Sequence, residues 1–227
     1  MTRKTWWIGA ALLLAAGGAV ALAVAERPDE PAAREASERP TLALLTSLPL
    51  MFGESFGLDG GGSPTLTRLE QRYDVVPIPV ADAASLKGRK LLLMAHPRAQ
   101  PAEVLVELDQ WVREGGRVLL LADPMLSWES ERPVGDPLRP PPAFADTGLL
   151  AHWGVELWAS GPGDPPVETA SPGKLVSKRC ELASGGFIAR CSVGKGRATI
   201  IADADFLNGE PKNLDLLIDE LAGLERP

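Results

Sequence analysis

The chain has 227 residues, of which 45% are hydrophobic, with a formal charge of −7 and a mean hydropathy of +0.01. These values exclude a protein with many membrane spans, a coiled coil and a fully disordered chain. Because 30 acidic residues outnumber 23 basic ones, the surface is not suited to neutralising phosphates, and we expect no nucleic-acid partner. Two cysteines and two histidines are too few for a disulfide-dense scaffold or a structural zinc module. One globular domain is expected.

The first segment contains twenty consecutive uncharged residues, at positions 6–25. As a helix it would span about 30 Å, the thickness of a bilayer core, which predicts a single transmembrane anchor. Arg3 and Lys4 precede it, so the positive-inside rule leaves the N-terminus in the cytoplasm and exports the rest of the chain to the outer side of the cytoplasmic (inner) membrane. The tripeptide at positions 23–25 also fits a signal-peptidase site, so secretion after cleavage behind Ala25 is the alternative.

Residues 26–40 contain five acids, three arginines and three prolines, but no Ile, Leu, Val or aromatic side chain. Such a segment cannot bury apolar surface and is predicted to be a solvated, disordered tether. The predicted organisation is therefore a signal anchor or signal peptide at residues 1–25, the tether at residues 26–40 and a single α/β domain at residues 41–227.

Apolar runs alternate with helical patterns from residue 41 onward. Strands are predicted at residues 41–46, 74–80, 90–95, 117–122, 155–158 and 197–202. Helices are predicted from Pro64, over residues 101–114 and 144–153, and after Asn213. Two prolines in the second strand place it at a sheet edge. The alternation predicts right-handed βαβ units in an open, mainly parallel sheet.

The two cysteines belong to a segment that is symmetric about Gly185 and Gly186. An antiparallel register pairs Cys180 with Cys191. We expect a four-residue turn, because it makes the cysteines a non-hydrogen-bonded pair, in which the β-carbons lie closer. In an exported protein this predicts an added β-hairpin closed by a disulfide, with two unlinked thiols as the alternative.

Residues 124–142 carry six prolines, and the segment is too long and too proline-rich for a simple connection. It is predicted to be either a lid or docking surface, or a tolerated insertion. Met125, Leu126 and Trp128 lie in it and are candidate contacts for a partner, although they can equally fold back onto the domain.

Polar residues follow the predicted parallel strands, at the edge where ligands gather in open α/β sheets. They are Ser47, His96, Asp123, Asp203 and Asp205. A hydrolase could use Ser47 with His96 and an aspartate, or the three aspartates could hold Mg²⁺. The same residues also serve as turn formers and caps, which is the simpler interpretation.

Motifs that would support catalysis are missing. The sequence has no Gly-x-Ser-x-Gly nucleophile elbow, no P-loop and no cluster of Cys and His. We therefore predict no catalytic residue, no cofactor and no metal ion, and we keep Ser47, His96, Asp123 and Asp205 as candidates for an alternative catalytic site.

Four blocks of sequence resemble the exported domain of GldG-type proteins. The blocks are residues 46–54 (TSLPLMFGE), 121–124 (LADP), 153–155 (WGV) and above all 194–208 (GKGRATIIADADFLN). Proteins of this family are auxiliary components of ABC-type transport systems linked to gliding motility. The resemblance implies a flavodoxin-like, class I glutamine-amidotransferase-like domain that usually lacks catalytic machinery, with permease and ATPase subunits of an ABC transporter as partners.

The favoured prediction is a non-catalytic extracytoplasmic domain, anchored in the cytoplasmic membrane by residues 6–25, that acts as an accessory or binding subunit of an ABC-type transport or cell-envelope complex. One alternative is a periplasmic α/β hydrolase with its site at the carboxyl ends of the strands. The other is a binding module for a small ligand or a glycan.

Overall fold

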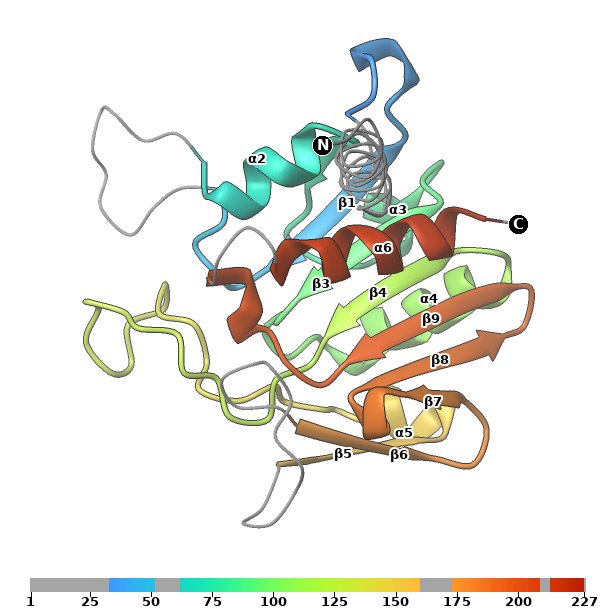
Figure 1. The fold of residues 1–227 in the computed structure, drawn as a ribbon. Coiled ribbons are helices and arrows are strands. Elements are labelled where there is room, and N and C mark those ends of the chain that lie inside the picture. The colour runs from blue at the N-terminus through green and yellow to red at the C-terminus, as the bar shows by residue number, and fades with distance from the viewer. Residues whose placement is uncertain (1–32, 52–61, 160–172, 209–212, 227) are drawn as a thin grey trace, which may run out of the picture. The chain divides into compact units, whose positions relative to one another are not determined.

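A seven-stranded sheet with helices on both faces forms the folded domain (Figure 1). The structure is a computed structural model that describes residues 33–51, 62–159, 173–208 and 213–226. The strands are β1 (Thr41–Thr46), β2 (Asp74–Pro77), β3 (Leu91–Ala95), β4 (Arg117–Leu121), β5 (Val155–Ala159), β6 (Gly173–Ser177), β7 (Glu181–Ala183), β8 (Ile188–Val193) and β9 (Gly196–Ile201). The α-helices are α2 (Pro64–Glu70), α3 (Ala83–Leu86), α4 (Ala102–Arg113), α5 (Leu149–Trp153) and α6 (Leu214–Glu225), and the 3₁₀ helices are η1 (Ala36–Glu38), η2 (Ser184–Gly186) and η3 (Asp205–Asn208).

The strand order of the large sheet is β2-β1-β3-β4-β9-β8-β7. The first five strands run parallel, and β8 and β7 extend the sheet in antiparallel fashion. Numbered along the chain, the parallel strands have the order 2-1-3-4-5, which is that of flavodoxin-like sheets. The predicted mainly parallel α/β sheet with an added hairpin is thus confirmed.

Two elements are shorter than predicted. Strand β2 lies at the sheet edge, as expected, but it ends at Pro77, because Pro79 has no N–H to continue the ladder. The helix predicted over residues 144–153 is confined to α5, since Gly148 precedes it with a φ of 111°, a conformation that is easy only for glycine.

The central strands β3 and β4 are buried on both faces. No residue of β3 is more than 4% exposed, and the last four residues of β4 are fully buried. Leu92 and Leu120 belong to a cluster with the apolar stripe of α4, and Leu93 and Leu119 belong to a second cluster with the leucines of α6. Their continuous apolar sequence is typical of parallel strands that are covered by helices on both sides.

The predicted hairpin, its register and its disulfide are confirmed. A disulfide joins Cys180 to Cys191, whose Cα atoms are 4.4 Å apart. Ala183 pairs with Ile188 as the last pair of the β7–β8 ladder, which leaves a four-residue turn at residues 184–187. Strands β5 and β6 form a separate antiparallel pair.

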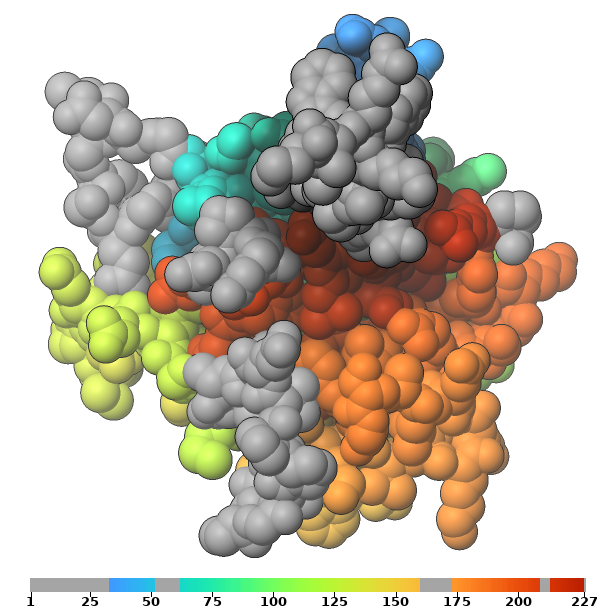
Figure 2. Space-filling view, in the orientation of Figure 1, coloured from blue at the N-terminus to red at the C-terminus, as the bar shows by residue number. Residues whose placement is uncertain are grey.

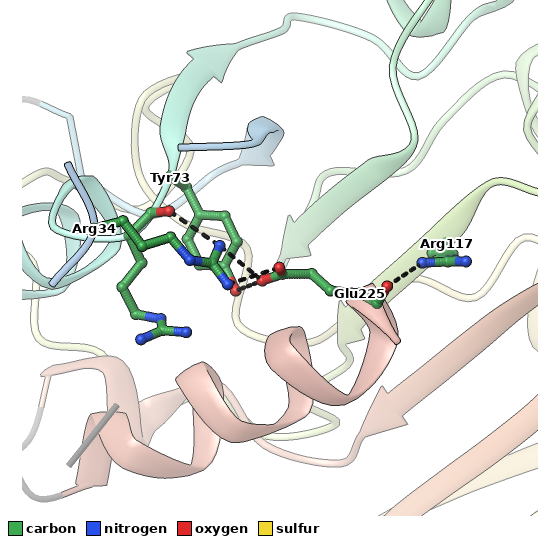
Figure 3. A network of polar contacts seen from close by, with 5 residues as sticks. Arg34, Tyr73, Arg117 and Glu225 are labelled. Atoms are coloured by element: carbon green, nitrogen blue, oxygen red, sulfur yellow. Dashed lines mark hydrogen bonds and ion pairs between the residues drawn. The ribbon is translucent and has the colours of Figure 1, made fainter. Parts of the chain in front are cut away.

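The start of the described chain is fixed to the last helix (Figure 3). The Arg34 guanidinium donates to both carboxylate oxygens of Glu225, at 2.8 and 3.2 Å, and lies 5.6 Å from the centroid of the Tyr73 ring. The Tyr73 hydroxyl donates to the same carboxylate at 2.6 Å, and burial together with this hydrogen bond raises the pKa of Tyr73. Arg34 lies in the segment expected to be a solvated tether, but here it connects that segment to α6.

No helix in the described ranges is long and apolar enough to cross a bilayer. The predicted anchor at residues 6–25, the alternative cleavage site behind Ala25 and the first part of the predicted tether, residues 26–32, all lie outside the described residues.

Replacing both cysteines with serine is expected to lower the free energy of unfolding by about 2–3 kcal/mol, because the bridge closes a loop with a sequence separation of 11 residues. Chemical denaturation of C180S/C191S and of the wild type, each with and without reductant, measures this difference. Reductant should destabilise the wild type by a similar amount and leave the variant unchanged. Equal stability of the variant and the oxidised wild type would contradict a stabilising disulfide.

Candidate functional site

The fold brings the predicted strand-end residues to one edge of the sheet. Strands β1, β3, β4 and β9 are adjacent and parallel, so their carboxyl ends meet there. Ser47 follows β1, His96 follows β3, Asp123 follows β4, and Asp203 and Asp205 follow β9. The order of the strands reverses between β1 and β3, which is where ligands bind in flavodoxin-like sheets.

At this switch point, hydroxyl groups join the two strand ends. Thr46 Oγ1 donates to the carbonyl of Ala95 at 2.9 Å, and Ser47 Oγ donates to the carbonyl of His96 at 2.5 Å. Ser47 therefore gives its proton to the main chain of His96 rather than to the imidazole ring. The hydrogen bond from a serine to a histidine ring that a catalytic triad requires is not formed between these two residues.

His96 is held in an unusual backbone conformation under the proline-rich loop. Its φ is 46°, which is uncommon outside glycine, and its side chain is 0% exposed. Nε2 lies 2.9 Å from the carbonyl of Pro141, and Nδ1 has no hydrogen-bond partner within the described ranges. Burial lowers the pKa of His96, so the ring is neutral at physiological pH.

Asp123 connects the ends of two strands. One carboxylate oxygen accepts the N–H of Met125 at 2.8 Å, and the other accepts the N–H of Ala204 at 3.0 Å. Burial raises the pKa of Asp123 to about 6, and the neighbouring carboxylates of Asp203 and Asp205 add to this effect. Part of the protein therefore carries a proton on this group at mildly acidic pH.

Asp205 holds the start of the proline-rich loop. Its carboxylate accepts the main-chain N–H of Ser127 at 3.0 Å and the Ser127 hydroxyl at 2.6 Å. Asp203 accepts the N–H of Asp205 at 2.6 Å. These contacts agree with the simpler interpretation of the aspartates as turn formers and caps.

The three aspartates also have the chemistry of a cation site. Each offers one oxygen, and these oxygens lie within 4.8 Å of one another. Hard cations such as Mg²⁺ and Ca²⁺ prefer such ligands. However, each of the three already accepts a main-chain N–H, so the cluster can exist as a purely structural network.

The loop at residues 124–142 is fixed at both ends. Phe144 N donates to the carbonyl of Asp123, and Leu126 N donates to the carbonyl of Pro142. Leu126 and Trp128 are half-buried against the α6-side core, whereas Met125 is 55% exposed. Of the three predicted partner contacts, only Met125 thus presents most of its side chain to solvent.

Sequence reasoning missed two of the exposed apolar residues in this loop. Val134 is 92% exposed and Leu138 is 60% exposed. They were not distinguishable from the other apolar residues of the loop, because local sequence does not tell which side chains fold back onto the core. It also missed Ser127, which contacts Asp205 across 78 positions of sequence.

Asp123 is expected to make stability depend on pH. Its pKa of about 6 in the folded state exceeds the ordinary value of 3.8, so the folded state binds the proton more tightly. The resulting stabilisation is fully present below about pH 4 and disappears as the pH rises through 6. Between pH 7.5 and pH 5, wild type should gain roughly 1–1.5 kcal/mol of unfolding free energy relative to Asp123→Asn.

Urea denaturation at the two pH values measures this change. The control is Asp219→Asn, which replaces an exposed carboxylate on α6. If the wild type and Asp123→Asn respond to pH in the same way, the elevated pKa is wrong.

Similarity to solved structures is weak. An exo-β-1,4-mannosidase from Opitutaceae bacterium strain TAV5 matches at 14% identity with a TM-score of 0.45, over 82% of this chain and 36% of the mannosidase. The cytoplasmic protein STM3548 from Salmonella typhimurium matches at 13% identity with a TM-score of 0.42, over 81% of this chain and 98% of its own. A cold-adapted β-galactosidase from Rahnella sp. R3 matches at 13% identity with a TM-score of 0.45, over 83% of this chain and 32% of its own. The chain spans only about a third of either glycosidase, and these likenesses support no inference about function.

No curated protein sequence is similar enough to the chain to count as a match. A family model described as an ABC-type uncharacterized transport system does match, over residues 39–159. The matched range runs from just before β1 to the end of β5 and contains the whole proline-rich loop. It covers more than half of the 227 residues and agrees with the resemblance found in the sequence. The chain therefore belongs to the family of ABC-type uncharacterized transport systems.

Proposed function

We propose that the protein is a non-catalytic accessory subunit of an ABC-type transport complex, anchored in the cytoplasmic membrane by residues 6–25. Its N-terminus lies in the cytoplasm and its α/β domain lies on the outer side. The family match over residues 39–159 carries this proposal. The uncharged segment and the basic residues before it support the anchor and the orientation.

The geometry of the strand edge supports a role without catalysis. The Ser47 hydroxyl is engaged by a main-chain carbonyl, and the His96 ring is buried under the proline-rich loop. Asp123 and Asp205 bind main-chain N–H groups at the start of that loop, and Asp123 also binds the N–H of Ala204 after β9. Three residues that a hydrolase would use, namely His96, Asp123 and Asp205, instead contact the loop. The fourth, Ser47, joins the ends of β1 and β3.

The loop itself is the surface that we assign to the partner. It is fixed by Asp123 and Asp205, so its apolar residues are presented in a defined arrangement rather than on a free chain. Met125, Val134 and Leu138 are exposed on it, and its atoms form part of the outer surface (Figure 2). Exposed apolar side chains on a fixed loop are typical of protein contacts. The occupant is an extracytoplasmic part of the permease or of another subunit of the complex.

Gentle detergent extraction, capture through a C-terminal tag and mass spectrometry test this proposal. Permease or ATPase subunits should be enriched with the wild type. The variant M125S/V134S/L138S should reduce their recovery about tenfold, because it removes apolar contact area while leaving the buried contacts of the loop intact.

The matched control is Val106→Ser, which removes an apolar side chain that is 67% exposed on α4. It should leave recovery unchanged. If no transporter subunit is enriched with the wild type, the accessory role in a complex is contradicted. If the subunits are enriched equally with all variants, the loop is not the contact surface.

A further inference from the structure

The amino-terminal edge of the sheet carries a concentration of positive charge. We call it the basic edge, and it consists of Lys87, Arg89, Lys90, Arg117, Lys195, Arg197 and Arg226. Strands β3, β4 and β9 are neighbours, with Leu91 opposite Arg117 and Arg117 opposite Arg197. The residues that begin these strands thus form one continuous row, and α6 ends on the same side (Figure 1).

The charges of the basic edge are not neutralised by carboxylates. Arg117 donates to the carbonyl of Glu225 at 2.6 Å, and Arg197 donates to the carbonyl of Leu224 at 3.1 Å. Both cations stabilise the C-terminal end of α6, where the helix dipole favours positive charge, but they keep their net charge. Arg89 likewise binds a main-chain carbonyl and not a carboxylate, namely that of Ser85 in α3.

Four further cations on this edge are exposed and form no ion pair within the part of the chain that the structure describes; they are Lys87, Lys90, Lys195 and Arg226. The acidic side chains of the cleft are Glu107 of α4 and Glu114, the residue that follows α4. Asp74, which begins β2, and Glu225, which is paired with Arg34, lie on the same edge. Glu107 accepts the N–H of Ala83, and Glu114 accepts a hydrogen bond from Gln110. Positive charge therefore dominates this edge, although the whole chain has a charge of −7.

A cleft with a volume of about 460 Å³ opens on the basic edge. Lys87, Arg89 and Lys90 line one side, and Trp111 and Glu114 lie on the α4 side. The indole N–H of Trp111 donates to the carbonyl of Arg89 at 3.3 Å, which fixes the ring. Tryptophan next to basic side chains is typical of protein surfaces at the level of lipid headgroups.

The opposite edge has the reverse charge. Asp123, Asp203 and Asp205 are buried there, and the loop adds three acidic residues. Together they outnumber the basic residues of the same edge, which are Arg98, Arg132 and Arg139. An anionic surface would therefore repel the carboxyl edge of the sheet and attract the amino edge. Basic residues near such a surface are attracted to it electrostatically.

The chain also enters the domain at the basic edge. Arg34 binds Glu225, the last residue of α6, and its main-chain N–H donates to the carbonyl of Gln71. Residues 26–32 are the seven positions between the proposed anchor and the first described residue. Even fully extended, seven residues reach only about 25 Å. The membrane is thus within a short distance of the basic edge, if residues 6–25 form the anchor.

We propose that the basic edge rests on the anionic phospholipid headgroups of the membrane in which the chain is anchored. This orientation depends on the proposed anchor. It directs the carboxyl edge and the proline-rich loop away from the bilayer, where the extracytoplasmic part of a partner subunit can reach them. The attraction is electrostatic, so it weakens as salt shortens the screening length.

Lysine acetylation of the full-length protein in lipid vesicles tests the orientation. Vesicles of 30% phosphatidylglycerol in phosphatidylcholine are compared with vesicles of phosphatidylcholine alone, and mass spectrometry gives the rate at each lysine. Lys87, Lys90 and Lys195 should react at least threefold more slowly on the anionic vesicles, and 0.5 M NaCl should remove the difference. Lys174, which is exposed on β6, should react equally on both and serves as the internal reference.

Two charge-reversal variants extend the test. Lys90→Glu with Arg226→Glu should abolish the protection of Lys87 and Lys195, because it replaces two positive charges of the basic edge with two negative ones, a net change of −4. Arg98→Glu with Arg132→Glu makes the same change in charge at the carboxyl edge and in the proline-rich loop, and should leave the protection intact. Equal effects of the two variants would show attraction without a preferred face and would overturn the proposal.

Flotation of the vesicles in alkaline carbonate reports separately on the anchor. A chain that is released by carbonate overturns the anchor, and the orientation with it. A chain that stays with the vesicles, but whose lysines react equally on both lipids, overturns only the contact of the basic edge with lipid.

Discussion

Burial of β3 and β4 on both faces is the constraint on which the rest of the domain depends. Apart from Arg117, these strands consist of apolar residues, mostly leucine. Exposing these side chains to water would cost free energy. A strand of this kind needs a helix on each side, and α4 and α6 supply their apolar stripes to the two faces. The positions of the sheet edges follow, because parallel strands bring all their carboxyl ends to one side and all their amino ends to the other.

The two edges use polar groups differently. At the carboxyl edge, the side chains are buried and bind main-chain groups, as Asp123 does between Met125 and Ala204. The cost is an elevated pKa, since a buried carboxylate has lost its hydration. At the amino edge, Arg117 and Arg197 remain charged while they bind carbonyls at the end of α6. One edge is therefore a network that holds a loop, and the other is a charged surface.

The sequence was a good guide wherever structure follows from local pattern. Continuous apolar runs predicted β3, β4 and β9, and the symmetry about Gly185 and Gly186 predicted the hairpin register and the disulfide. The strand-end residues were identified because parallel strands end together. The sequence pattern could not predict side-chain contacts between residues that are far apart in the chain. An example is the ion pair of Arg34 with Glu225, which is 191 positions away.

The contact between Arg34 and Glu225 has a mechanical consequence. It joins the segment that enters the domain to the helix that ends the described chain, so a pull on the entering segment is shared between β1 and α6. Through Arg117, the load passes on to β4 in the middle of the sheet. A force on the entering segment would thus be transmitted to the most deeply buried part of the domain.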